Sequence, residues 1–335
     1  KYIHYGDIHT GKAKKINEPS KLPSITKGNY STLRNGDVVV ADASEDYKGI
    51  ADAAILLSTG AFSIIAGLHT IAFRPNRKLV FPMFIYYNLQ TSRFKHYGYH
   101  VGTGLKVFGI SSNLFFDYSA FHPSLIEQQE ISKLIESLEN LLSLQQRKLE
   151  QLMQLKKAML QQLFVDKNCK QPILRFKNFN DNWEERKLSD IANYRNGKAH
   201  EQYIDMNGIY TVVNSKFIST NGKVKKFSNK PIELLKKGEI AFVLSDVPNG
   251  KALAKAYLID SDNRYSLNQR IAGITPSSDI NSYFLYILIN RNRYFLKFDD
   301  GVGQTNLSKK DIEEFKENYP LFDEQQKIAN LFSKI

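Results

Sequence analysis

The sequence contains the stretch FHPSLIEQQEISKLIESL at 121–138 and a second version of it, NYPLFDEQQKIANLFSKI, at 318–335. The two stretches share six residues without a gap: a proline, the tripeptide Glu-Gln-Gln, an isoleucine and a leucine. The offset from Pro123 to Pro320 is 197 residues. Apolar residues three and four positions apart lie on one face of a helix, so each copy predicts an amphipathic helix. A helix that recurs once at this distance indicates that a larger unit is duplicated.

The repeat extends upstream of both helices. LRNGDVVVAD at 33–42 matches LKKGEIAFVL at 235–244, and each predicts a turn followed by a buried strand. The aromatic stretch at 80–105 matches 280–307, and each combines a helical pattern with a later Gly-x-Gly turn. A looser match pairs residues 1–8 with 208–218. The offsets vary by a few residues, which is typical of loop insertions in a duplicated domain.

The region 124–164 is the clearest secondary-structure prediction. Ser124 and Glu127 have the spacing of a capping box, and apolar residues follow at helical spacing as far as Leu163. About 41 residues at ~1.5 Å each give a helix about 60 Å long, which needs a partner to cover its apolar stripe. Two interpretations remain: the helix packs on its own domain, or it pairs with the helix that begins near Leu321.

Composition limits the class of protein. The chain has 335 residues, a net charge of +12 and one cysteine, Cys169, so a secreted disulfide scaffold is excluded and a reducing cytoplasmic setting fits better. The most apolar stretch, 50–68, contains Asp52 and several Ser, Thr and Gly residues, so we interpret it as a pair of buried strands joined by a turn rather than a membrane span.

Positive charge is concentrated outside the long helix. Residues 1–123 carry a net charge of +6, residues 183–318 carry +4 and the stretch 167–182 carries +3, whereas 124–166 carries −1 and 319–335 is neutral. A basic amphipathic membrane helix would show the opposite distribution. A polyanion such as nucleic acid is therefore the expected partner of the two similar halves.

No pattern predicts catalysis or metal binding. Gly11-Lys12 and Gly197-Lys198 lack the other residues of a phosphate-binding loop, and the two Gly-x-Gly turns lack the third glycine of a dinucleotide site. The sequence contains no Asn/Asp-Pro-Pro-aromatic segment of an amino-methyltransferase, no His-Glu-x-x-His and no Cys/His group with zinc spacing. We therefore predict no catalytic residue, no metal ligand and no cofactor of its own.

Each half instead places basic, amide and aromatic residues together in expected loops. Lys and Arg neutralise phosphates, and Arg, Asn and Gln can form paired hydrogen bonds with base edges in the major groove. A plain solvated surface is the alternative for any single residue, but the recurrence in both halves favours DNA contact. The predicted DNA-binding residues are Lys12, Lys14, Lys15, Arg93, Lys95, Lys198, Asn214, Lys216, Lys223, Lys225, Gln269, Arg270, Gln304 and Asn306.

Several motifs together resemble the specificity subunit of type I restriction-modification systems. They are the two Pro-x-x-x-Glu-Gln-Gln-x-Ile segments, the helical stretch LQQRKLEQLMQLKKAMLQQLF at 144–164, WEERKLSDI at 183–191, YSLNQRIAGITP at 265–276 and GVGQTNLS at 301–308. They occur in the order typical of that family and cover nearly the whole chain.

The resemblance implies an α+β fold in which two similar α/β target recognition domains are separated by long antiparallel, coiled-coil-like helices with pseudo-two-fold symmetry. The expected parts are a first recognition domain at 1–123, a spacer helix at 124–166, a linker at 167–182, a second recognition domain at 183–318 and the start of a second spacer helix at 319–335. The internal comparison predicts that about 25 residues are missing at each end. The first recognition domain, 1–123, would then be incomplete at its N-terminus, and the second spacer helix, 319–335, at its C-terminus.

The resemblance also implies the function and the partners. Each recognition domain would read one half of a bipartite site in double-stranded DNA, with half-sites about one helical turn, ~34 Å, apart. Two methyltransferase subunits and the motor-nuclease subunits would join the chain, and S-adenosylmethionine, ATP and magnesium would bind to those partners rather than to this cytoplasmic, non-catalytic subunit, which needs no membrane. The helix residues expected to dock partners are Gln128, Gln129, Ile131, Leu134, Leu138, Gln325, Gln326, Ile328 and Leu331.

Two alternatives remain at this point. One is the recognition part of a fused DNA methyltransferase, which requires cofactor motifs that the sequence lacks. The other is a non-catalytic coiled-coil interaction module without sequence-specific DNA binding, which predicts basic residues along the long helix as well as on the two halves.

Overall fold

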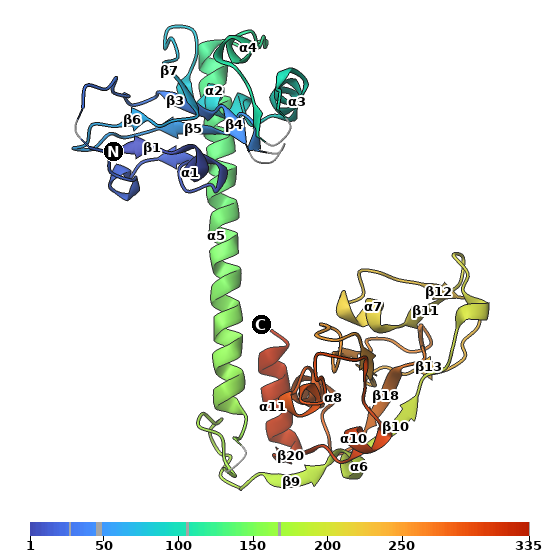
Figure 1. Cartoon of the computed structure of the whole chain (residues 1–335). Coiled ribbons are helices and arrows are strands. Elements are labelled where there is room, and N and C mark those ends of the chain that lie inside the picture. The colour runs from blue at the N-terminus through green and yellow to red at the C-terminus, as the bar shows by residue number, and fades with distance from the viewer. Residues whose placement is uncertain (27, 45–48, 105–106, 167–168, 335) are drawn as a thin grey trace. The chain divides into compact units, whose positions relative to one another are not determined.

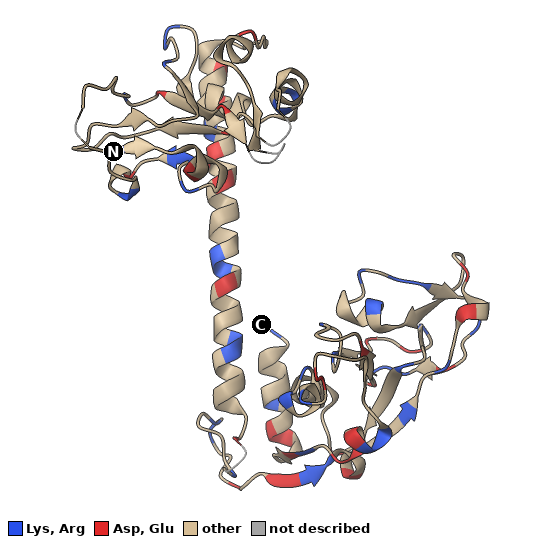
Figure 2. Cartoon of the chain, viewed as in Figure 1, with Lys and Arg blue, Asp and Glu red and all other residues tan. Residues whose placement is uncertain are grey.

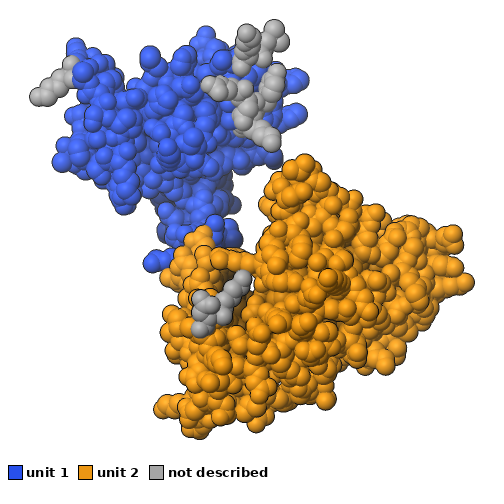
Figure 3. All heavy atoms as spheres, turned by 60° about the horizontal axis from the view of Figure 1, so that its bottom comes forward, with its two compact units in different colours: residues 1–147 blue, residues 148–335 orange. Residues whose placement is uncertain are grey.

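The computed structural model describes residues 1–26, 28–44, 49–104, 107–166 and 169–334. The chain divides into two compact units, residues 1–147 and residues 148–335, which we call unit 1 and unit 2 (Figure 3). The boundary lies inside the helix α5 (Leu125–Leu163), so each unit includes part of the helix that the sequence analysis treated as a separate spacer.

Unit 1 is built on a mixed four-stranded sheet in the order β2-β5-β3-β7, in which only β2 and β5 are parallel. Two further strand pairs, β1 with β6 and β4 with β8, complete its β-structure. The strands of unit 1 are β1 (Tyr2–Ile3), β2 (Lys15–Ile16), β3 (Val38–Ala41), β4 (Ala43–Ser44), β5 (Ala53–Leu56), β6 (Ile65–Ala66), β7 (Thr70–Phe73) and β8 (Phe108–Gly109).

The central strand β3 is apolar throughout because both of its faces are buried. Val38 and Val40 face a cluster that includes Phe94 and Phe115, while Val39 faces a second cluster on the other side of the sheet. Helices contribute the residues that cover Val38 and Val40 in the first cluster, and α1 contributes Ile8 to the second cluster (Figure 1). The helices are α1 (Tyr5–His9), the short η1 (Pro19–Lys21), α2 (Pro82–Asn88), α3 (Ser92–Val101) and α4 (Ser112–Phe116).

Unit 2 contains two four-stranded sheets, β10-β18-β14-β16 and β12-β11-β17-β13, and two strand pairs, β15 with β19 and β9 with β20. Its strands are β9 (Glu184–Lys187), β10 (Ala192–Asn196), β11 (Tyr210–Val213), β12 (Phe227–Ser228), β13 (Leu234–Leu235), β14 (Ile240–Val243), β15 (Ser245–Asp246), β16 (Ala256–Leu258), β17 (Tyr265–Leu267), β18 (Ile271–Pro276), β19 (Thr305–Asn306) and β20 (Lys316–Tyr319). Its helices are α6 (Leu188–Ile191), η3 (Glu201–Tyr203), α7 (Ser215–Ser219), α8 (Ser282–Ile289), α9 (Arg293–Leu296), α10 (Lys309–Glu313) and α11 (Phe322–Phe332).

Unit 2 repeats the layering of unit 1. Strand β14 corresponds to β3: Ile240 and Phe242 pack on one cluster, whereas Ala241 and Val243 pack on another. Strand β14 lies between β16 and β18, as β3 lies between β5 and β7, and all four of these pairings are antiparallel. The short parallel pair β11–β17 likewise corresponds to β1–β6. The duplicated unit inferred from the helix motif is therefore present in the fold.

The first glutamine of each Glu-Gln-Gln motif holds the start of its helix against its own unit. The side chain of Gln128 accepts a hydrogen bond from the Phe81 backbone N–H at 2.9 Å and donates to the carbonyls of Leu79, at 3.1 Å, and Pro123, at 2.9 Å. Gln325 makes the same three bonds with Asn281, Asp279 and Pro320. Both amides are only 1% exposed, so their hydrogen bonds are made without competition from water.

The C-terminal part of α5 packs against α11 within unit 2. Leu163 belongs to the same buried cluster as Ile328 and Phe332, and the rings of Phe164 and Phe332 lie 6.1 Å apart. The two helices run in opposite directions (Figure 1). The expected pairing of the long helix with the helix beginning near Leu321 is thus present at this end of α5.

One detail of the sequence interpretation is wrong. The apolar stretch 50–68 does contain two strands, β5 and β6, but they do not pair with each other. Strand β5 joins the four-stranded sheet and β6 pairs with β1, because the turn between them carries the chain from one sheet to the other. In the part of the chain that the structure describes, every helix is too short or too polar to span a bilayer.

Candidate nucleic-acid interface

Two loops of unit 2 lie side by side because the short strands next to them pair. Strand β15 pairs with β19 so that Ser245 faces Asn306, which brings residues 246–251 next to residues 299–304. The Asn249 side-chain amide donates to the Gly301 carbonyl at 3.4 Å and connects the two loops directly. We call residues 246–251 and 299–304 the paired loops.

Carboxylates hold the backbone of each paired loop. In the first loop, Asp246 accepts hydrogen bonds from three backbone N–H groups, those of Val247, Ala252 and Leu253, at 2.6–3.0 Å. A side chain at Gly250 would collide with the Asp246 carboxylate, so this close approach requires glycine. The backbone of the first loop is therefore held by the Asp246 carboxylate at its base.

The second paired loop is held in the same way. Asp300 accepts hydrogen bonds from the backbone N–H groups of Val302, at 2.9 Å, and Gly303, at 3.2 Å. These two bonds hold the pKa of the Asp300 carboxyl below its usual value, because they favour its charged form.

The predicted DNA-binding residues Gln304 and Asn306 lie where this second loop enters β19, and both are exposed. The Gln304 amide nitrogen donates to the Ser245 hydroxyl at 2.7 Å, which orients the side chain while its carbonyl oxygen stays available. Side-chain amides of Asn and Gln form paired hydrogen bonds with adenine in the major groove, so an oriented amide at a loop edge suits this role.

A second group of predicted residues surrounds a chain crossing at Gly197. A side chain there would collide with the Asn268 carbonyl, and the crossing places Lys198 beside Asn268. Here most of the polar groups already have partners: Gln269 donates to Glu201 at 2.6 Å, and Lys198 lies 3.1 Å from Glu233. Two further predicted residues support the backbone, since Asn214 caps α7 through the Phe217 N–H and the Arg270 carbonyl accepts from the Leu244 N–H.

Three predicted lysines of unit 2 remain free to meet an anion. Lys216 lies on α7, and Lys223 and Lys225 lie in the loop that follows it; all three are exposed. Within the described ranges, none of them has a carboxylate within ion-pair distance. They therefore present unpaired positive charge, which suits a phosphate backbone.

The predicted lysines and arginine of unit 1 separate into exposed and paired groups. Lys12, Lys14 and Arg93 are exposed. Lys95 contacts Asp52 at 2.5 Å and donates to the Ile50 carbonyl at 2.9 Å. Lys15 binds Glu139 of α5 and the Tyr87 hydroxyl. Lys15 and Lys95 thus hold unit 1 together, and the structure gives neither of them a free charge.

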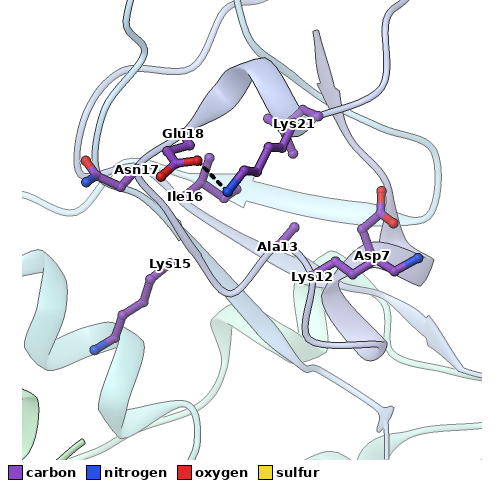
Figure 4. A pocket seen from close by; sticks show the side chains of 9 residues that line it. Asp7, Lys12, Ala13, Lys15, Ile16, Asn17, Glu18 and Lys21 are labelled. Atoms are coloured by element: carbon purple, nitrogen blue, oxygen red, sulfur yellow. Dashed lines mark ion pairs between the residues drawn. The ribbon is translucent and has the colours of Figure 1, made fainter. Parts of the chain in front are cut away.

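A hollow of about 480 Å³ lies beside the loop that carries Lys12, and its lining includes Lys15 and Lys21 (Figure 4). These side chains do not converge: Lys15 points away from Lys21, and Lys21 forms an ion pair with Glu18 at 2.5 Å. The hollow therefore lacks the clustered donors of a small-molecule phosphate site. Across the described residues, no three His, Cys, Asp or Glu side chains are grouped so that they could hold a metal ion.

The residues proposed for partner docking also differ in exposure. Gln128 and Gln325 face inward, and Ile328 is covered, whereas Leu134 and Leu138 are 62% and 51% exposed. The remaining residues of this set, Gln129, Ile131, Gln326 and Leu331, are partly or fully exposed. Figure 2 shows residues of both signs along α5. The part of α5 before residue 140, which includes Leu134 and Leu138, carries four acidic residues and one basic residue, whereas the part from Arg147 onward carries four basic residues and one acidic residue.

Sequence reasoning missed the valines at the tips of the paired loops. Val247 and Val302 are 63% and 84% exposed, although valine usually lies in protein cores. One signal in the sequence could have indicated these loops. DVPNGK at 246–251 is rich in turn-forming residues and follows a buried strand, and the Gly-x-Gly turn at 301–303 follows a helix. Only the pairing of β15 with β19 shows that the two stretches meet.

Comparison with known proteins identifies the class of this fold. Residues 180–335 match the family model of the type I restriction modification DNA specificity domain. Over 96% of the chain, the fold matches 82% of the type I restriction-modification system S subunit from M. genitalium, with 18% identity and a TM-score of 0.55. Over 99% of the chain, it also matches 82% of a chain from a structure described as "Structural basis underlying complex assembly and conformational transition of the type I R-M system", with 14% identity and a TM-score of 0.51.

Residues 180–335, just under half of the chain, therefore match a type I restriction modification DNA specificity domain. The fold over nearly the whole chain agrees with that of the solved S subunit. The resemblance predicted from the helix motifs is thus confirmed, and with it the function class, DNA specificity within a type I restriction-modification system.

Proposed function

We propose that unit 1 and unit 2 each read one half of a bipartite site in double-stranded DNA, as parts of a non-catalytic cytoplasmic subunit. The observation that carries this proposal is the repeated architecture, in which β4–β8 and β15–β19 occupy corresponding positions of the two units. In unit 2 this strand pair supports the paired loops with Gln304 and Asn306, and free lysines lie on the same unit. Amides for bases and lysines for phosphates are the two components of sequence-specific DNA binding.

Methyltransferase and motor-nuclease subunits are the proposed protein partners. The neighbour described with the words "complex assembly" supports this, and so does the exposed apolar stripe of α5 at Leu134 and Leu138. S-adenosylmethionine, ATP and magnesium would be bound by these partners. A stripe of exposed leucines along a helix is typical of a surface that another helix covers.

The test is to map DNA methylation in cells that carry the complete system with this chain or with a Gln304→Ala variant. We expect one bipartite site for the native chain and relaxed selectivity at only one half of it for Gln304→Ala. Gln269→Ala should relax selectivity at the same half. Asn229→Ala is the control: it removes an exposed amide that lies outside the paired loops and outside the residues around Gly197, so it should leave the recognised site unchanged.

Three outcomes would contradict the proposal. Equal loss at both halves would show that the units do not divide the site. Absence of any bipartite site would favour a coiled-coil interaction module instead. Transfer of labelled methyl groups from S-adenosylmethionine to DNA by this chain alone would identify a fused methyltransferase.

A further inference from the structure

We propose that Val247 and Val302 form a subsite for the 5-methyl group of a pyrimidine base within the half-site that unit 2 reads. This inference rests on the proposed function and assigns one chemical group on the DNA to the tips of the paired loops. The methyl group belongs either to thymine or to 5-methylcytosine, and both present it in the major groove.

The first observation is that both valines are exposed although their loops are rigidly held. The Val247 N–H donates to Asp246 at 2.9 Å and its carbonyl accepts from the Gly250 N–H, also at 2.9 Å, while the Val302 N–H donates to Asp300 at 2.9 Å. A flexible tip could fold its apolar side chain back onto the protein. The hydrogen bonds hold the backbone at both valines, and their side chains stay exposed to water until a partner covers them.

The second observation is the chemistry next to the valines. Gln304 and Asn306 follow Val302 on the same loop and strand, and Asn249 of the first loop donates a hydrogen bond to the Gly301 carbonyl of the second. An adenine–thymine pair presents a hydrogen-bond donor and acceptor on adenine and a methyl group on thymine along one groove edge. Amides bond to the adenine and small apolar side chains contact the methyl group, so the paired loops carry both types of reader.

The third observation is the open backbone at Gly303. A side-chain carbon placed on Gly303 would have no atom within 4 Å, so the space beside this glycine is empty. DNA can therefore approach the loop backbone between Val302 and Gln304 without steric hindrance. A site with a bare backbone beside an apolar tip suits the flat edge of a base better than a bulky side chain from a protein partner.

The test requires the half-sites, which methylation mapping of the complete system provides. Purified complex containing the full chain is then titrated with fluorescent duplexes in which each thymine of the unit 2 half-site is replaced, one at a time, by deoxyuridine. This change removes only the methyl group. Separate duplexes carry 5-methylcytosine in place of each cytosine, which distinguishes the two sources of the methyl group.

For the native chain, we expect one deoxyuridine or one 5-methylcytosine substitution to change affinity by about fourfold, the value of one buried methyl group. Val302→Ala and Val247→Ala should lower affinity for the native site and reduce the response to that substitution. Met206→Ala is the matched control, because Met206 is 93% exposed on the same unit but lies outside the paired loops.

The proposal is overturned if no pyrimidine methyl substitution in that half-site changes the affinity of the native chain. It is equally overturned if the valine variants respond to the substitution as strongly as the native chain does. Loss of partner assembly, rather than of DNA discrimination, in the valine variants would assign the tips to a protein contact. Failure of the proposed function is a different result, because no bipartite site would then be mapped.

Discussion

Arg195 and Glu239 form two hydrogen bonds, of 2.5 and 2.7 Å, between neighbouring parts of the unit 2 core. In unit 1 the corresponding acid is Asp37, which receives two bonds of 2.7 and 2.8 Å from Arg74. The acids occupy equivalent positions before β14 and β3, but Arg195 lies on β10 whereas Arg74 directly follows β7, because the unit 2 strand β10 has no counterpart in the described part of unit 1. In both units an arginine therefore neutralises the buried acid, but the two arginines occupy different positions in the fold.

Arg195→Ala should strongly destabilise unit 2. Glu239 is only 5% exposed, so loss of its arginine leaves a buried charge without its main partner, which costs about 3–5 kcal/mol of unfolding free energy. The single tryptophan, Trp183, is buried in unit 2, so its fluorescence during urea unfolding reports on this unit. Arg186→Ala is the control, since the Arg186–Asp279 pair is partly exposed and should contribute less than about 1 kcal/mol. Equal effects of the two substitutions would contradict this assignment.

The same carboxylate predicts a pH dependence. Burial raises the pKa of Glu239, but hydrogen bonds from Arg195, Thr275 and the Lys236 backbone outweigh it and hold the pKa below the ordinary value of 4.5. The unfolded state then binds more protons, so this group stabilises unit 2 above pH 4.5 and the contribution is lost as pH falls through the lowered pKa. Unfolding free energy measured by Trp183 fluorescence should fall more steeply in acid for the native chain than for Glu239→Gln. Parallel curves would show that Glu239 does not contribute.

Gln325→Ala should destabilise unit 2 although it removes no apolar contact. It leaves the Asn281 N–H and two carbonyls without their partner, and one unsatisfied buried group costs about 1–3 kcal/mol. The neighbouring Gln326 is exposed, so Gln326→Ala should change the unfolding free energy by less than about 0.5 kcal/mol. Urea unfolding of the two variants compares a buried and an exposed amide of the same motif. Similar stabilities would refute the structural role of Gln325.

The lysines should separate into two functional groups in DNA-binding experiments. Lys223→Ala removes an unpaired charge and should reduce the slope of log affinity against log salt concentration by about 1. Lys15 is occupied by Glu139 and Tyr87, so Lys15→Ala should leave this slope nearly unchanged and lower the melting temperature instead. A slope change of equal size for both variants would place Lys15 on the DNA.

The exposed stripe of α5 should be required for assembly rather than for folding. Leu138→Glu puts a charge at an exposed apolar position, so the melting temperature should stay within a few degrees while association with the methyltransferase subunits is lost. Gel filtration of the mixed subunits measures this. Lys133→Glu, a charge change at an exposed position of the same helix, is the control. Normal assembly of Leu138→Glu would remove this stripe from the interface.

The sequence predicted the elements whose signal is local and repeated. The helix at α5, the buried strands β3 and β14 and the duplication followed from apolar periodicity and from the Glu-Gln-Gln motif. The role of Gln128 could not be predicted in this way, because its partner Phe81 lies 47 residues earlier in the chain. Side-chain pairing is equally invisible: Lys15 and Glu139 are separated by 124 residues, and nothing in HTGKAKK distinguishes Lys15 from Lys14.

Only the polar residues of the candidate site could be predicted from the sequence. Gln304 and Asn306 were identified from their amides, and the structure places them at the paired loops. Val247 and Val302 were missed because a valine in a sequence normally indicates a buried strand. Their exposure depends on the pairing of β15 with β19, which joins segments about 60 residues apart and has no local signature.

The carboxylates at the base of the paired loops have a consequence for evolution. Asp246, Asp300 and Gly250 shape the backbone from below, so positions 247 and 302 can change residue type without disturbing the fold. A lineage could exchange one recognised base for another through single codon changes at these tips while keeping the same framework and the same assembly. New target preferences would then arise without an intermediate that fails to fold.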